Sequence, residues 1–118
     1  MYGLPTNFDA GVFAGRELVQ VCFTVNTISL NFEGDLSITV ESSMIYKRNQ
    51  SDAGEEVSPP VYSTRIMSVI GKTVRAASGA EDGTLTLQFD DGQRLIFLDN
   101  SKAYESYKIR VGEDLIIV

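Results

Sequence analysis

The sequence of 118 residues contains no histidine and no tryptophan, and it has a single cysteine, Cys22. Histidine titrates near neutral pH and often binds zinc or haem iron, so its absence removes the usual catalytic base and the usual metal ligand. One cysteine excludes an intrachain disulfide, and its place in the apolar run VQVCFTV indicates a buried structural thiol. We therefore expect a protein that is not an enzyme and that holds no cofactor or metal ion.

Long hydrophobic runs and a basic N-terminal region are also missing. No run approaches the ~18 apolar residues that a membrane helix needs, and the stretch MYGLPTNFDAGVFAGREL does not resemble a signal peptide. The glycine patterns of nucleotide-binding loops do not occur. We expect a cytoplasmic protein without a membrane partner, and the length predicts one domain over residues 1–118.

Basic residues are scarce in the first half of the chain. Residues 1–60 hold three Lys and Arg against eight Asp and Glu, residues 61–118 hold seven against eight, and the net charge is −6. The sequence has no cluster of Lys and Arg residues of the kind that binds nucleic acid, so we expect no nucleic-acid partner. The acidic balance leaves two interpretations open, which are simple solubility and attraction to a basic protein partner.

Acidic residues occur in pairs where the chain is expected to turn. The pairs are Glu33 and Asp35, Glu81 and Asp82, and Asp90 and Asp91. Such residues are common in turns for their local hydrogen bonding, whereas a calcium or magnesium site needs several oxygens from more than one loop. No metal ligand is therefore assigned.

Two stretches, 15–43 and 71–101, follow the same pattern. Each begins with Gly and a basic residue, continues into an alternating apolar strand that ends in Phe, and passes through an acidic Gly turn into a second apolar strand. The pattern predicts two pseudo-repeated antiparallel β-meanders, with the register set by three-residue turns. The expected opposite pairs are Phe32 with Leu36, Leu87 with Leu95, and Leu85 with Phe97.

The remaining segments predict a loop, a helix and a last hairpin. Residues 46–60 are polar and rich in Ser, Gly and Pro, which indicates a mobile surface loop. Residues 60–70 have proline at the start and Gly71 after the end, which predicts one short α-helix. The segment 103–118 predicts a C-terminal hairpin whose apolar edge strand a homodimer would cover.

These elements predict a mostly β, α+β domain. The two meanders and the C-terminal hairpin are expected to form a curled sheet or partial barrel around one core, with one short α-helix. The expected core residues are Val21, Phe23, Leu30, Ile38, Ile70, Leu85, Leu87, Leu95, Phe97 and Ile109.

One interaction patch is predicted, from the tyrosines near the C-terminus and an acidic turn. Tyr104 and Tyr107 flank Glu105, and tyrosine is enriched at protein interfaces. Together with Asp90 and Asp91 they form the candidate patch. Packing of the tyrosines across neighbouring strands is the alternative explanation.

The second half of the chain resembles a family of small bacterial proteins of unknown function. The resemblance rests on a Gly after the expected helix, on the hairpin pattern DGxLxLxFxDGxxL, and on the motif Tyr-Glu-Ser-aromatic, where Tyr107 stands in place of the usual Trp. It covers about half of the chain and implies no activity. By analogy with small acidic proteins of this kind, it implies an immunity-like partner of another protein.

Two functional hypotheses follow from the sequence. The first is a non-catalytic protein-interaction module that binds or neutralises a basic partner, or pairs with itself as a homodimer. The second is a small-molecule or metal-ion binding module, with a pocket between the two meanders near residues 46–60 and the acidic turns.

Overall fold

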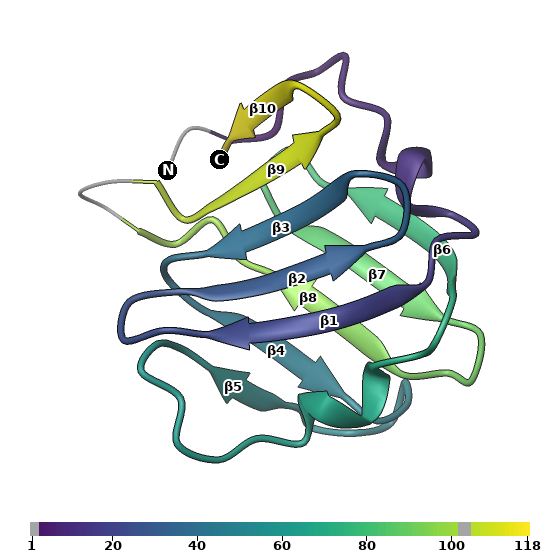
Figure 1. Ribbon diagram of the computed structural model, residues 1–118, viewed down its shortest axis with the longest axis vertical. Helices are drawn as coiled ribbons and strands as arrows, with labels where there is room; N and C mark the ends of the chain where they lie inside the picture. Colours follow the sequence, from purple (N-terminus) through teal and green to yellow (C-terminus); the bar gives the residue numbers. More distant parts are fainter. Residues whose placement is uncertain (1–2, 102–104) are drawn as a thin grey trace.

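The computed structural model describes residues 3–101 and 105–118 and consists of two five-stranded antiparallel sheets, one in front of the other (Figure 1). The first sheet has the strand order β1-β2-β3-β9-β10 and the second the order β5-β4-β8-β7-β6. The strands of the first sheet are β1 (Leu18–Phe23), β2 (Ile28–Phe32), β3 (Leu36–Val40), β9 (Tyr107–Val111) and β10 (Asp114–Ile117). Those of the second sheet are β4 (Met44–Lys47), β5 (Glu55–Val57), β6 (Val74–Gly79), β7 (Leu85–Phe89) and β8 (Arg94–Phe97).

Both halves of the chain have the same order of elements. A 3-10 turn, η1 (Ala10–Phe13) or η2 (Ile66–Val69), comes before a three-stranded meander, and a two-stranded hairpin follows the meander. The hairpins are exchanged between the sheets, because β4 pairs with β8 of the second half and β9 pairs with β3 of the first. Each sheet is therefore completed by strands from the other half of the chain.

The halves meet at two glycines in matching positions. Gly15 donates its N–H to the carbonyl of Val74 at 2.8 Å, and Gly71 donates to the carbonyl of Leu18 at 2.7 Å. In return, Val74 N–H bonds the Arg16 carbonyl and Leu18 N–H bonds the Lys72 carbonyl, both at 2.9 Å. An isolated bridge between Glu17 and Thr73 lies between these bonds. The sheets are thus hydrogen-bonded to each other at one corner, and the sandwich is not a closed barrel.

Alternating burial of the strands explains how the core forms. Strands β2, β3 and β7 each bury their first, third and fifth residues, as expected for a strand that turns one face to a second sheet. The predicted registers are confirmed, since Phe32 pairs with Leu36, Leu87 with Leu95, and Leu85 with Phe97. The predicted core is confirmed at seven positions: Leu30, Ile38, Leu85, Leu87, Leu95, Phe97 and Ile109.

The predicted α-helix over 60–70 is wrong, because only the 3-10 turn η2 forms there. Side chains occupy the backbone groups that would begin a helix. Glu55 accepts the Arg65 N–H at 3.1 Å, and Thr64 accepts the Ile66 N–H at 3.1 Å. Such side-chain bonds compete with helical ones, and the prolines set only the start of the segment.

The predicted loop over 46–60 is also wrong in part, because it contains the end of β4 and all of β5. Met44, Ile45 and Tyr46 pair with the three residues of β5. The connection between the two strands is tied down by Asp52, which accepts the Arg48 N–H at 2.8 Å. The polar composition reflects this turn and an edge strand rather than a loop over the whole segment.

Three predicted core residues and the cysteine differ from expectation. Phe23 is 37% exposed, while Val21 and Ile70 are half-buried. An irregularity between Leu18 and Gln20 inserts an extra residue into β1, and β1 is an edge strand, so fewer neighbours cover its side chains. Cys22 is half-buried because its partner Ser29 lies on the outer face of the sheet.

We predict that Gly71→Ala lowers the free energy of unfolding by about 1–2 kcal/mol, because Gly71 has φ +88° and a Cβ is strained in the left-handed region. A Cβ would meet no heavy atom within 4 Å, so the loss is one of backbone conformation alone. Urea denaturation measures it. Gly71→Asn is the control and should lose less, because Asn adopts this region more readily. Equal losses in both variants would contradict the explanation.

Candidate functional site

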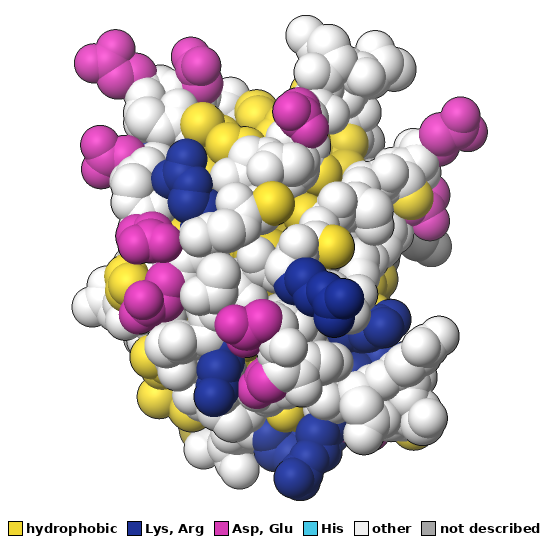
Figure 2. Space-filling model, turned by 90° about the vertical axis from the view of Figure 1, so that its right-hand side faces the viewer, with side chains coloured by type: hydrophobic (Ala, Val, Ile, Leu, Met, Phe, Trp, Pro, Cys, Tyr) yellow, Lys and Arg dark blue, Asp and Glu magenta, His cyan; other side chains and the backbone are white. Residues whose placement is uncertain are grey.

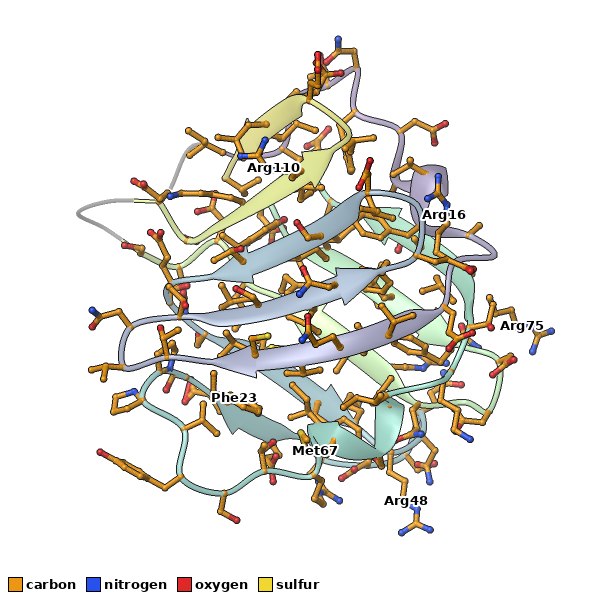
Figure 3. The ribbon with its side chains drawn as sticks, viewed as in Figure 1. Arg16, Phe23, Arg48, Met67, Arg75 and Arg110 are labelled. Carbon is orange, nitrogen blue, oxygen red and sulfur yellow. The ribbon has the colours of Figure 1, made fainter. Side chains whose placement is uncertain are left out.

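Exposed apolar side chains gather along the free edge of β1. Five of the seven large exposed hydrophobics among the described residues lie on β1, on the turn after it, and on the segment 58–71 that connects β5 to β6. The other two, Leu115 and Ile117, lie on β10 at the opposite edge of the same sheet. We call the first five the β1-edge surface: Val19 (48% exposed), Phe23 (37%), Val25 (73%), Tyr62 (92%) and Met67 (50%). Figure 3 shows Phe23 and Met67 on the same lower side of the molecule.

The segment 58–71 follows β1 from one end to the other. Gly71 bonds Leu18 at the start of β1, and Pro59 and Pro60 line a hollow with Val25 beyond its end. The segment does not pair with β1 as a strand between these points. The edge of the first sheet is therefore bordered by chain but left without a partner strand.

The corresponding edge of the second sheet is covered. There, β6 carries Ala77 and Gly79 on the positions that match Val21 and Phe23 in the pairing. The side chain of Leu4 lies so close to Gly79 that a Cβ would come within 2.8 Å of it. Small residues thus let the N-terminal segment close over β6, whereas large residues keep the β1-edge surface open.

A polar pocket of about 520 Å³ opens where β4, η2 and the β7–β8 turn meet. It is lined by Tyr46, Arg48, Arg65, Ser68, Asp91 and Gln93. The pocket lies beside residues 46–60 and the acidic turn at 90–92, but no residue of the first meander lines it, so it is not the pocket between the two meanders that the second hypothesis expects.

A buried amide organises the pocket. The Gln93 Oε1 accepts hydrogen bonds from the hydroxyls of Tyr46 at 2.6 Å and Ser68 at 2.7 Å, and its Nε2 donates to Asp91 Oδ2 at 2.7 Å. Burial raises the pKa of Asp91, but the hydrogen bonds from Gln93 outweigh this effect and hold the pKa below its usual value. Asp91 is therefore an anion at neutral pH, and it lies 3.8 Å from Lys72 Nζ.

Both signs of charge surround the pocket. Arg65 lies over the ring of Tyr46, 5.0 Å from its centroid, and pairs with Asp52 at 3.3 Å and Glu55 at 3.6 Å. Arg48 extends from the lower edge of the molecule (Figure 3). These groups suit a small, charged ligand that can form hydrogen bonds. A few convergent polar groups in a pocket fix the orientation of such a ligand.

The structure does not assemble the patch predicted from the sequence. Tyr104 lies outside the described residues. Tyr107 is fully buried, so its place in a surface patch is wrong; its hydroxyl donates to the Gly83 carbonyl at 2.6 Å and its ring packs 5.9 Å from Phe97. The burial follows from register, because Tyr107 faces the core opposite Val40.

The acidic members of the predicted patch belong to separate networks. Glu105 lies 3.5 Å from Lys108, which also pairs with Glu41 at 3.0 Å. Asp90 is exposed at the end of β7, and Asp91 belongs to the polar pocket. In the part of the chain that the structure describes, no group of three acidic or cysteine residues is placed to hold a metal ion.

We predict that Tyr107→Phe destabilises the fold by about 1–2 kcal/mol, because the buried Gly83 carbonyl loses its donor. Burial, followed by the charges of Asp99 and Asp82, raises the pKa of Tyr107 above its ordinary value of 10.0. The stabilisation is therefore complete below pH 10 and is lost as the pH rises further.

The check is the free energy of unfolding between pH 8 and about 11, where the raised pKa gives the wild type a steeper decline than Tyr107→Phe. The matched control is Tyr62→Phe, because Tyr62 is 92% exposed and should leave both stability and its pH dependence unchanged. A decline of the same slope in the wild type and Tyr107→Phe would contradict the assignment.

Neither the β1-edge surface nor the polar pocket was located from the sequence. The pattern of residues 60–70 predicts a short α-helix, and it does not indicate that Tyr62 and Met67 lie exposed beside β1. The pocket needs β4 beside β8, a pairing across the halves that no local pattern indicates. Across the described ranges, no helix is long and apolar enough to cross a membrane.

Comparison with known proteins gives a family but no characterised relative. A search of curated proteins and a search of solved structures each found no match. A model of a protein family, described as a family of unknown function (DUF6188), matches residues 12–118. This match includes every strand of both sheets. The chain therefore belongs to this family of unknown function.

Proposed function

We propose that the protein is a non-catalytic protein-interaction module that binds a basic protein partner through the β1-edge surface. The observation that carries the proposal is the set of exposed aromatic, Met and Val side chains along a strand edge without a partner strand. Aromatic residues and Met are enriched in the buried centres of protein interfaces. An open strand edge can also add a strand of a partner.

Charge supports the choice of a basic partner. At the start of β1, Glu17 N–H donates to the Glu33 carboxylate at 3.0 Å, which brings two acidic residues together. One cation lies among them, because Arg16 donates to the Glu33 carbonyl at 2.9 Å, so acidic residues exceed basic ones at this end without being alone there. The β9–β10 turn joins the β2–β3 turn through a bond from Gly112 N–H to the Asp35 carbonyl at 2.9 Å. Figure 2 shows Asp and Glu side chains gathered over the upper left of this side of the molecule. An acidic end beside an apolar edge steers cationic proteins toward it.

The proposal also covers where the protein acts and what its binding does, which the family resemblance and the composition imply. We infer a cytoplasmic bacterial protein, and neutralisation of a basic, harmful protein is the immunity-like form of the function. We also infer that the two halves descend from an internal duplication, since their elements occur in the same order and meet through matching bonds of Gly15 and Gly71.

We predict that Met67→Arg abolishes partner binding, because a cation replaces an apolar contact and repels a basic protein. The measurement is affinity capture from lysate of the source cell, with each protein that is captured identified and its isoelectric point compared. The wild type should retain one basic protein in stoichiometric amount, released by high salt.

Leu115→Arg is the matched control, because Leu115 is 46% exposed on β10 at the opposite edge of the same sheet. It should bind like the wild type. Equal loss in both variants, capture of an acidic protein, or self-association as the sole interaction would overturn the proposal. Sedimentation of the purified protein tests self-association directly.

A second candidate function is the binding of a small polar molecule, favoured by the pocket around Gln93.

We predict that a ligand of this pocket raises the melting temperature. A ligand that binds the folded state alone adds about 2.7 kcal/mol to the free energy of unfolding at a concentration of a hundred times its Kd. The measurement is a thermal scan against calcium, magnesium and a panel of polar metabolites. Arg48→Gln should abolish the shift and Arg110→Gln should keep it; no shift with any compound would contradict this candidate.

A further inference from the structure

Two cationic side chains face each other on the outer face of the second sheet, and a third lies at the β6 edge of the same sheet. Lys47 on β4 stands directly opposite Arg94 on β8. The neighbours of Arg94 in the same row are Gln88 on β7 and then Ala76 on β6. Arg75 lies beside Ala76 at the irregularity of β6 and extends away from the sheet edge (Figure 3). We call Lys47, Arg94 and Arg75 the cationic row.

Among the residues that the structure describes, these cations have no carboxylate partner. Ion pairs within the described residues use Arg65, Lys72 and Lys108, and none uses Lys47, Arg75 or Arg94. Figure 2 shows Lys and Arg side chains from the middle of that side to its bottom, with a few Asp or Glu side chains among them, while most acidic side chains lie higher. A chain of net charge −6 thus leaves positive charge uncompensated in one place.

The row is unfavourable for the folded protein alone. Like charges that face each other across neighbouring strands destabilise a sheet. In addition, the Nε of Arg94 is buried and has no hydrogen-bond partner among the described residues. A buried donor without an acceptor costs free energy. A bound anion would relieve the repulsion, and it would satisfy the Nε only after the Arg94 side chain turns outward.

We propose that the cationic row binds the phosphoryl group of an anionic ligand. The guanidinium of Arg94 presents a planar fork that matches two phosphate oxygens, and its Nε gains an acceptor when the side chain turns toward the ligand. Lys47 adds charge from the opposite strand. This function is separate from the proposed partner binding, because it uses the other sheet.

The surroundings of the row favour a compact anion over a nucleic acid. Glu56 on β5 stands opposite Ile45, one row away from Lys47, and Asp90 is exposed at the end of β7. Together with the net charge of −6, these carboxylates repel a long polyanion on either side. A single phosphoryl group, free or on a small molecule or peptide, fits between them.

The test is a titration of the ¹⁵N-labelled protein with inorganic phosphate, followed by amide chemical shifts at constant ionic strength. Saturable shifts should centre on Lys47 and Arg94, and Lys47→Gln should weaken binding about tenfold, the effect of one lost charge-assisted contact. Arg94→Lys keeps the charge but removes the fork, so it should also weaken binding. Arg110→Gln removes an exposed Arg from the outer face of the first sheet and should bind like the wild type.

Two further arms identify the source of the phosphoryl group. Tighter binding of a phosphoserine peptide than of phosphate points to a phosphoprotein, and tighter binding of a sugar phosphate points to a small molecule; either supports the proposal. Lys47→Gln without ligand should raise the melting temperature, because the repulsion with Arg94 is gone. Shifts that do not saturate, or that Arg110→Gln weakens equally, would overturn the proposal.

Discussion

The reciprocal hydrogen bonds of Gly15 and Gly71 are the constraint on which the rest of the structure depends. They fix the starts of β1 and β6 against each other at one corner, and each glycine has a positive φ. From that corner the two meanders diverge into separate sheets. Their outer ends can then be completed only by a hairpin from the other half. The matching arrangement of the two meanders around one core is in keeping with these equivalent bonds.

The two edges differ in chemistry although their backbones pair in the same register. Val19 of β1 and Arg75 of β6 occupy the matching irregular positions after the first strand residue. One contributes to an apolar surface and the other to a cationic row. Because an irregular position is unpaired in the ladder, its side chain can change without disturbing the register. Different partners on the two sheets are consistent with this difference.

Local patterns predicted the parts of the fold that local physics decides. The meanders and their registers follow from turn length and alternation, as the pairing of Phe32 with Leu36 shows. The helix over 60–70 failed because Glu55, distant in the local pattern, binds the Arg65 N–H. The exposure of Phe23 and the burial of Tyr107 depend on which strand lies at an edge and which faces the core. The polar pocket and the cationic row need β4 beside β8, a pairing that only tertiary structure specifies.

The exchange of hairpins has a consequence for synthesis on the ribosome. Strand β3 is made early, but its neighbour β9 begins some seventy residues later, at Tyr107. The first sheet is therefore incomplete until almost the whole chain has emerged, and β3 presents an open edge until then. Pairing between strands so distant in sequence closes a large loop late, which slows folding and leaves the nascent chain exposed. We expect β3 to keep an unpaired edge until β9 has been made, and this edge is exposed to other chains for longer than the strands of a local meander are.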